Sequence, residues 1–211
     1  MFKKLSMLVV LFILTLGLVA NTASAETADS STKDVDKYKD ELANLSEEEV
    51  SEKFSEIDER YDMEEEFSKK DQAFIEMYAK PVEEDGSHNI TPFKSENVSG
   101  SKTVNGITVK VNGTVNINVQ GIINQSFGAS NLKTRTTAGG SKVKSVTTKV
   151  NHNAYGLVGS GGVGKVYSGS ITGTGKNHTL NTTKKYTGNV AYGKTWTETT
   201  VNYNGGTFTV P

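Results

Sequence analysis

The stretch that decides the fold is residues 107–119, which read ITVKVNGTVNINV. Its apolar residues fall on odd positions, and this period of two is typical of a half-buried β-strand. A two-residue turn at Asn112-Gly113 would place Val109 opposite Asn116 and so mix the apolar and polar faces. A three-residue loop over 112–114 keeps one apolar face, and so does a single long strand. Both of these arrangements stay open from the sequence.

The composition of this stretch continues to the C-terminus. Residues 96–211 contain 20 Thr, 19 Gly, 15 Val and 14 Asn. Threonine and valine favour strands, whereas glycine and asparagine favour turns. Further strands are predicted at 142–150, 154–158, 163–171, 185–191, 195–203 and 207–210, with glycine-rich turns at 139–140, 159–162 and 204–206. Six to eight short strands without helical periodicity predict a basic all-β domain over 101–211, an antiparallel β-sandwich or barrel. We expect its core to contain the valines with Tyr155, Leu157, Tyr167, Trp196, Tyr203 and Phe208.

The N-terminus carries the pattern of a cleaved secretory signal over residues 1–25. Lys3 and Lys4 precede an apolar run over 7–20, and Ala23-Ser24-Ala25 supplies the small residues that precede a cleavage site. The apolar run is shorter than the roughly 18–20 residues of a membrane-spanning helix. We therefore expect cleavage after Ala25 and a secreted, extracellular protein, with an uncleaved anchor as the alternative.

Residues 26–80 are predicted to form an acidic helical pro-region. Ser46 and Glu49 have the spacing of a capping box, and an apolar stripe over 50–61 follows on an otherwise charged helix. A second helix is predicted from Ser68 up to Pro81. The stripes are too thin for an independent core, so the segment is either a solvated, partly disordered hairpin or a pro-region docked on the basic domain.

Charge divides the chain into opposed blocks. Residues 26–95 hold 22 acidic and 9 basic residues, whereas residues 96–211 hold 12 basic and 2 acidic residues. The change of sign falls near residues 81–100, which we interpret as a linker and the natural site of a proteolytic cut.

Residue types exclude most catalytic chemistry. The chain has no cysteine, and Glu198 is the only carboxylate after Glu96. Paired carboxylates for hydrolysis and clusters for metal binding are therefore missing, and His152 and His178 are expected at the surface. Residues 159–165 match the phosphate-loop pattern but are followed by Val166 instead of Ser or Thr, and they join two predicted strands. We therefore predict no enzyme, cofactor, metal or nucleotide.

The remaining signal is positive charge outside a cell, which favours an anionic partner such as membrane lipid or wall polymer. Candidate envelope-binding residues are Lys142, Lys144, Lys149, Lys184, Lys185 and Trp196. If residues 142–150 form a regular strand, Lys142 and Lys144 share a face and Lys149 lies opposite, unless a bulge intervenes. The acidic pro-region is a second expected partner.

The layout of signal, acidic helical segment and basic cysteine-free half resembles large secreted bacteriocin precursors of Gram-positive bacteria, of the geobacillin type. The resemblance covers the organisation of the whole chain and no short motif. It implies an antibacterial toxin that acts on a competitor's envelope, by surface binding or as a small homo-oligomeric pore. Independently of the resemblance, the alternation in the glycine-rich segment 154–171 makes it a candidate membrane-inserting hairpin, with arms shorter than the roughly 9–11 residues of a transmembrane strand unless they are extended. The alternative is a non-toxic adhesive or matrix module that binds wall polymer or glycan.

Overall fold

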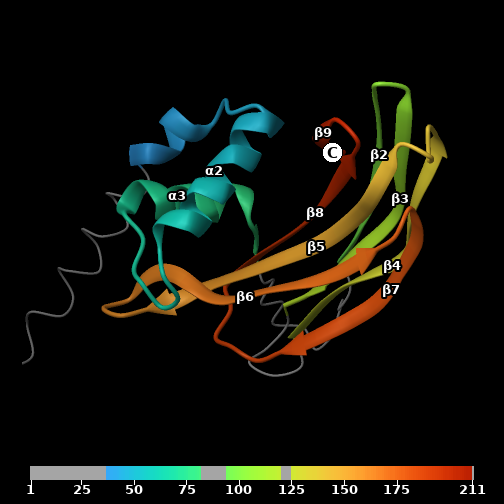
Figure 1. Cartoon of the computed structure of the whole chain (residues 1–211). Helices are drawn as coiled ribbons and strands as arrows, with labels where there is room; N and C mark the ends of the chain where they lie inside the picture. The colour runs from blue at the N-terminus through green and yellow to red at the C-terminus, as the bar shows by residue number, and fades with distance from the viewer. Residues whose placement is uncertain (1–36, 82–93, 120–124, 211) are drawn as a thin grey trace, which may run out of the picture.

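The protein is described by a computed structural model that covers residues 37–81, 94–119 and 125–210. The predicted signal sequence and Ala25 lie outside the described residues. The fold is mainly β, as the sequence predicts, with two antiparallel sheets and an N-terminal helical segment (Figure 1).

The helical segment begins with a helical turn over 37–42 and continues with α2 (Glu47–Arg60) and α3 (Lys69–Tyr78). The predicted capping box is confirmed: the Ser46 hydroxyl accepts from the Glu49 N–H, and the Glu49 carboxylate accepts from the Ser46 N–H at 2.7 Å. Ser68 caps α3, as its sequence position predicts. Both caps satisfy N–H groups that a helix start leaves without partners. None of the described helices is long and apolar enough to cross a membrane.

The two sheets contain nine strands within the described residues. Sheet A contains β1 (Lys80–Pro81), β5 (Val143–Val158), β6 (Gly162–Thr174), β8 (Tyr192–Tyr203) and β9 (Gly206–Val210). Its order is β1-β8-β5-β6, with β9 also on β8. Sheet B contains β2 (Lys94–Val104), β3 (Ile107–Asn118), β4 (Gln125–Ala138) and β7 (Asn177–Tyr186), in the order β2-β3-β4-β7.

Residues 107–118 form one long strand, β3, without a loop at 112–114. Of the two arrangements that the sequence allowed, the protein therefore has the single long strand. Gly113 does not turn the chain; it lies at an irregularity in the pairing with β4. A Cβ at Gly113 would lie 2.4 Å from the Cα of Leu132, so the close approach of β4 requires glycine here.

Several strand boundaries differ from the prediction. Residues 94–100, placed in the linker by the sequence, begin β2, and β4 was not predicted at all. The predicted strands 142–150 and 154–158 are one strand, β5, and the strand predicted over 185–191 is wrong because β7 ends at Tyr186. The turn over 159–161 joins β5 to β6, which confirms that the phosphate-loop pattern links two strands.

The main core lies between the sheets. It includes Val109, Phe127, Val150 and Val201, each 0% exposed. Of the predicted aromatic core residues, Tyr155 and Phe208 are buried, whereas Tyr167, Trp196 and Tyr203 are half-buried. Leu157 was wrongly placed in the core and is 59% exposed, because it lies on the outer face of β5 near the end of that strand.

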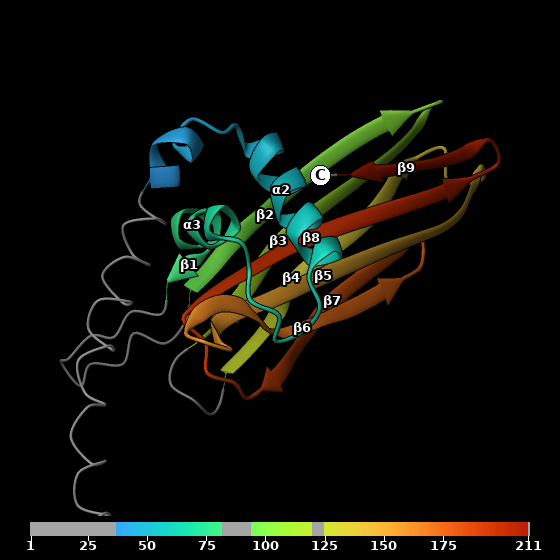
Figure 2. The ribbon, with the colours of Figure 1, turned by 90° about the vertical axis from the view of Figure 1, so that its left-hand side faces the viewer.

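The helical segment covers one end of the outer face of sheet A (Figures 1 and 2). The turns β2–β3, β4–β5, β6–β7 and β8–β9 gather at the far end, which we call the turn end. Tyr155, which touches the helices, is twelve residues along β5 from Val143, or about 40 Å at 3.3 Å per residue. The molecule therefore has a helical end and a turn end.

Candidate functional site

The described part of the acidic segment, residues 37–79, contacts sheet A through a short strap, Glu64–Phe67, which follows a turn at Met63-Glu64. The Glu64 N–H donates to the Lys165 carbonyl and the Phe67 N–H donates to the Val163 carbonyl, both at 2.9 Å. Glu66 forms an antiparallel bridge with Gly164. The strap therefore pairs with the outer edge of β6, as an additional strand would.

Two glycines allow this close contact. A Cβ at Gly164 would lie 2.3 Å from the Glu65 carbonyl oxygen, and one at Gly162 would lie 2.2 Å from the Glu66 carboxylate. Ser160 also donates to Glu66 at 2.9 Å. The β5–β6 hairpin is thus shaped for the strap by residues that lack a side chain.

An ion pair joins α2 to the sheet beside the strap. Lys165 Nζ lies 2.8 Å from Asp58 Oδ1 and 2.9 Å from the Asp58 carbonyl oxygen. Asn153 Nδ2 donates to the same carboxylate oxygen at 3.0 Å. Lys165 is 7% exposed and Asn153 is 1% exposed. The lysine of the phosphate-loop pattern therefore holds a carboxylate of the acidic segment.

An aromatic cluster completes the interface. Phe54 of α2 stacks on Tyr155 with ring centroids 6.4 Å apart and contacts Phe74 at 4.8 Å. Phe67 approaches Tyr155 at 6.0 Å, and Lys194 Nζ lies 5.1 Å above the Phe54 ring. Because Tyr155 and Val163 of the sheet share one buried cluster with the helices, the acidic segment is docked on the basic domain and is not a free solvated hairpin.

A buried carboxylate organises the segment itself. Asp71 is 1% exposed and accepts from Tyr61, Ser68 and Arg60 at 2.8–3.1 Å. Lys53 Nζ lies 3.1 Å from its other oxygen. Burial raises the pKa of Asp71, but its hydrogen bonds and Lys53 outweigh burial and leave the pKa below its ordinary value. The segment thus has its own fixed polar centre.

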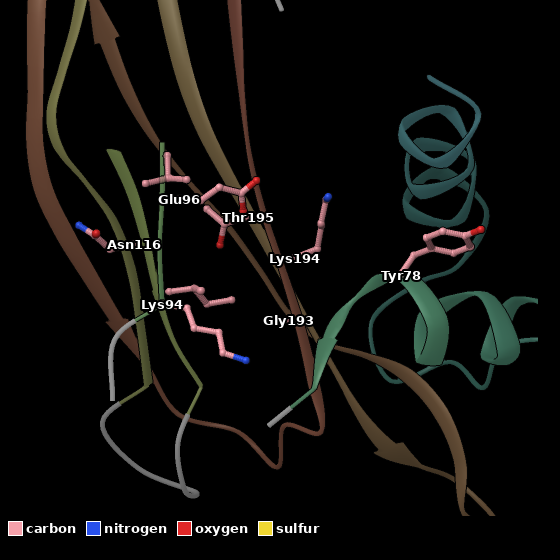
Figure 3. Close-up of a pocket in the computed structure, with 9 residues that line it drawn as sticks. Tyr78, Lys94, Glu96, Asn116, Gly193, Lys194 and Thr195 are labelled. Carbon is pink, nitrogen blue, oxygen red and sulfur yellow. The ribbon is translucent and has the colours of Figure 1, made fainter. Parts of the chain in front are cut away.

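A small pocket opens between the sheets beside the end of α3 (Figure 3). It is lined by Lys94 and Glu96 of β2, Thr195 of β8 and Tyr78, among others. Its volume of about 30 Å³ holds roughly one or two water molecules. The pocket has no room for an organic ligand.

The candidate envelope-binding residues do not form one patch. Lys142 lies in the turn before β5, and its Nζ donates to the Asn105 carbonyl. The pairing of β5 with β8 shifts between Val143 and Ser145, so Lys144 and Lys149 both point outward from sheet A; this is the bulge that the sequence left open. Lys149 pairs directly with Glu198. The remaining candidates lie apart: Lys184 and Lys185 are consecutive exposed residues of β7 in sheet B, and Trp196 is half-buried on β8.

Positive charge instead gathers at the turn end. Exposed lysines there are Lys102, Lys142, Lys144 and Lys176. The Lys176 ammonium donates to the Gly140 carbonyl at 2.7 Å and so ties two turns together. Within residues 94–119 and 125–210 the only carboxylates are Glu96 and Glu198, and neither lies in these turns. The sequence indicated only Lys142 and Lys144. Lys102 and Lys176 were missed because the order of the strands, which brings their turns to the same end, cannot be read from local patterns.

The prediction that His152 lies at the surface is wrong, because this side chain is 0% exposed between the sheets. Its Nδ1 lies 2.8 Å from the Thr195 hydroxyl and its Nε2 2.7 Å from the Tyr186 hydroxyl, and its ring stacks on Phe127. Burial lowers the pKa of His152 to about 3, although a hydrogen bond with the Lys194 backbone opposes the shift.

Because His152 is buried in its neutral form, we expect the folded protein to lose stability in acid. Its folded pKa of about 3 lies below its ordinary 6.5, so between these values the unfolded chain binds the proton and the folded chain does not. The free energy of unfolding should fall as the pH drops below 6.5, by up to about 1.4 kcal/mol per pH unit from this group. Urea unfolding at pH 7, 6 and 5 measures the slope. A His152→Gln variant should have a flatter profile, and equal slopes in both chains would contradict the assignment.

The chain matches no protein-family model, no curated protein and no solved structure. No group of three or more histidine or acidic side chains among the described residues is placed to hold a metal ion. The features of the molecule that bear on function are the docked acidic segment and the distribution of charge.

Proposed function

We propose that the chain is the secreted precursor of a bacteriocin-like antibacterial protein, which acts on the anionic envelope of competing bacteria once its acidic segment is removed. The observation that carries the proposal is the Asp58–Lys165 pair, through which an acidic segment covers part of a basic β domain. Residues 37–79 hold 15 acidic and 6 basic residues, whereas 94–119 and 125–210 hold 13 basic and 2 acidic residues. These opposed charges favour binding of the acidic segment to the basic domain. They also favour binding of the released basic domain to another negatively charged surface.

Release of the segment would uncover the hairpin formed by β5 and β6. The strap and α2 contact Tyr155, Val163 and Lys165 of this hairpin. Both surface binding and a small oligomeric pore remain consistent with the proposal. A protease site in residues 82–93 suits the release, because β1 ends at Pro81 and β2 begins at Lys94.

The test uses the full chain with a specific protease sequence inserted between Gly86 and Phe93. After cleavage and removal of the acidic segment, we expect reduced viability of related bacteria and dye release from anionic vesicles. Uncut protein and the wild-type chain treated with the same protease are the controls. Binding of wall sacculi without killing or leakage would replace the proposal by the adhesive module.

Charge reversal at the turn end tests how the released domain attaches. Each lysine near an anionic membrane contributes on the order of 1 kcal/mol. The Lys142→Glu, Lys144→Glu pair should therefore weaken binding to anionic vesicles by roughly 30-fold or more at low salt. Lys149→Glu should weaken it less, because Glu198 already lies opposite Lys149. Co-sedimentation across a salt series measures both, and binding that is insensitive to salt would contradict the electrostatic mechanism.

A further inference from the structure

We propose that Asn153 and Lys165 form an oxyanion-binding site on the outer face of sheet A. In the precursor the Asp58 carboxylate occupies this site, and in the released domain a carboxylate or phosphate group of an anionic wall polymer takes its place. The second half of this inference rests on the proposed function, whereas the site itself does not.

The first step is the geometry around Asp58. Its Oδ1 accepts from Lys165 Nζ at 2.8 Å and from Asn153 Nδ2 at 3.0 Å. Both donors belong to the sheet and are more than nine-tenths buried. A cation and an amide that converge on one oxygen form charge-assisted hydrogen bonds of the kind that recognise carboxylates and phosphates.

The second step is that the sheet holds these donors in place. Lys165 of β6 pairs directly with Tyr155 of β5, and Asn153 lies two residues from Tyr155 and thus on the same face. Asn153 in turn pairs with Lys194 of β8. Two adjacent strands, β5 and β6, therefore supply the donors, and only Asp58 comes from the acidic segment.

The third step is that Asp58 fills the site incompletely. The Tyr155 hydroxyl is buried, and among the described residues it has no acceptor for its proton. Burial raises the pKa of Tyr155, the neighbouring Asn153 amide opposes the shift, and the charge of Asp58 adds to it. A buried hydroxyl without a partner is costly. A phosphate group has more oxygens than the Asp58 carboxylate and would give this donor an acceptor as well, whereas a carboxylate ligand would replace Asp58 oxygen for oxygen.

Neighbouring side chains suit a sugar-bearing anion. Tyr192 pairs with Tyr155, and Trp196 lies two residues beyond Lys194 on the same face of β8. Aromatic rings with polar edges provide flat apolar surfaces beside polar groups. The site thus combines two oxyanion donors with aromatic residues on the same face of the sheet.

Chemical rescue in the full chain tests the site without any assumption about release. Asp58→Ala removes the carboxylate and leaves room for a small anion beside Lys165 and Asn153. Formate or inorganic phosphate should then raise the melting temperature of the variant by about 2–4 °C above chloride of equal ionic strength. The wild-type chain and the Asp58→Ala, Lys165→Met double variant measure the general effect of each salt on stability, and the rise in Asp58→Ala should exceed theirs by this amount. Equal melting temperatures of Asp58→Ala in all three salts would overturn the site.

A second measurement uses the wild-type chain, in case Asp58→Ala fails to fold. Glycerol phosphate or galacturonate should accelerate proteolysis of residues 37–79 relative to chloride of equal ionic strength, because the anion competes with Asp58. The more effective compound identifies phosphate or carboxylate as the preferred group. No anion-specific acceleration would also overturn the site. A third outcome separates the two proposals. If formate or phosphate raises the melting temperature of Asp58→Ala, but the released domain neither kills bacteria nor releases dye from vesicles, the site is retained and the antibacterial function is rejected.

Discussion

A Gly164→Ala variant should lose the docked acidic segment while the sandwich stays folded. The added Cβ would lie 2.3 Å from the Glu65 carbonyl oxygen and 2.5 Å from a methyl group of Val158, and real Cβ atoms do not approach other atoms so closely. The Val158 methyl group is the end of a side chain and can shift within the β5–β6 hairpin, whereas the Glu65 oxygen belongs to the backbone of the strap. The strap must therefore move away and give up the two hydrogen bonds from Glu64 and Phe67. Each such bond stabilises by about 1 kcal/mol, so we expect residues 37–79 to be digested at least roughly 10-fold faster in limited proteolysis.

Gly140→Ala is the matched control for this variant. A Cβ at Gly140 would have its nearest neighbour, the Thr136 methyl group, at 3.8 Å, which is an ordinary contact. Gly140 also lies at the turn end, far from the strap. Its digestion rate should equal that of the wild-type chain. Protection of the acidic segment that is unchanged in Gly164→Ala would show that the strap does not hold it.

Truncation of Phe127 should destabilise the whole sandwich. Phe127 is 0% exposed, lies on the inner face of β4 and stacks on His152 at 4.8 Å. Replacement of a buried phenylalanine by alanine removes its buried area and leaves a cavity, which typically costs 3–5 kcal/mol. Urea denaturation of Phe127→Ala should therefore show a free energy of unfolding lower by about that amount.

Leu157→Ala provides the comparison, because Leu157 is also a large apolar residue but is 59% exposed. Its removal should change the free energy of unfolding by about 0.5 kcal/mol or less. A similar loss in both variants would mean that Leu157 is covered in solution.

Local patterns predicted the parts of the fold that depend on neighbours in the chain. The capping box at Ser46 and the alternation in 107–119 follow directly from residue spacing, and both are confirmed. The strand β4 was missed because its first half contains small residues, Gly128 and Ala129 among them, and a register shift follows before Leu132. Period-two alternation is interrupted at such a shift.

The docking interface was predictable only in outline. Opposed charge indicated that the acidic segment contacts the basic domain, but nothing near Asp58 or Lys165 in the sequence indicates that they pair, 107 residues apart. The only sequence pattern that contains Lys165 is the phosphate-loop match over 159–165, which does not indicate an ion pair with Asp58. Burial of His152 was equally invisible, because its partners Thr195 and Tyr186 are remote in the chain.

The strap has a further consequence for the edge of sheet A. β6 is an outer strand of sheet A, and the strap occupies the carbonyls of Val163 and Lys165 along its free edge. An uncovered edge presents backbone groups that can template pairing with another chain, and so leads to aggregation. The acidic segment therefore hinders neighbouring copies of the chain from joining edge to edge at β6 into insoluble sheets.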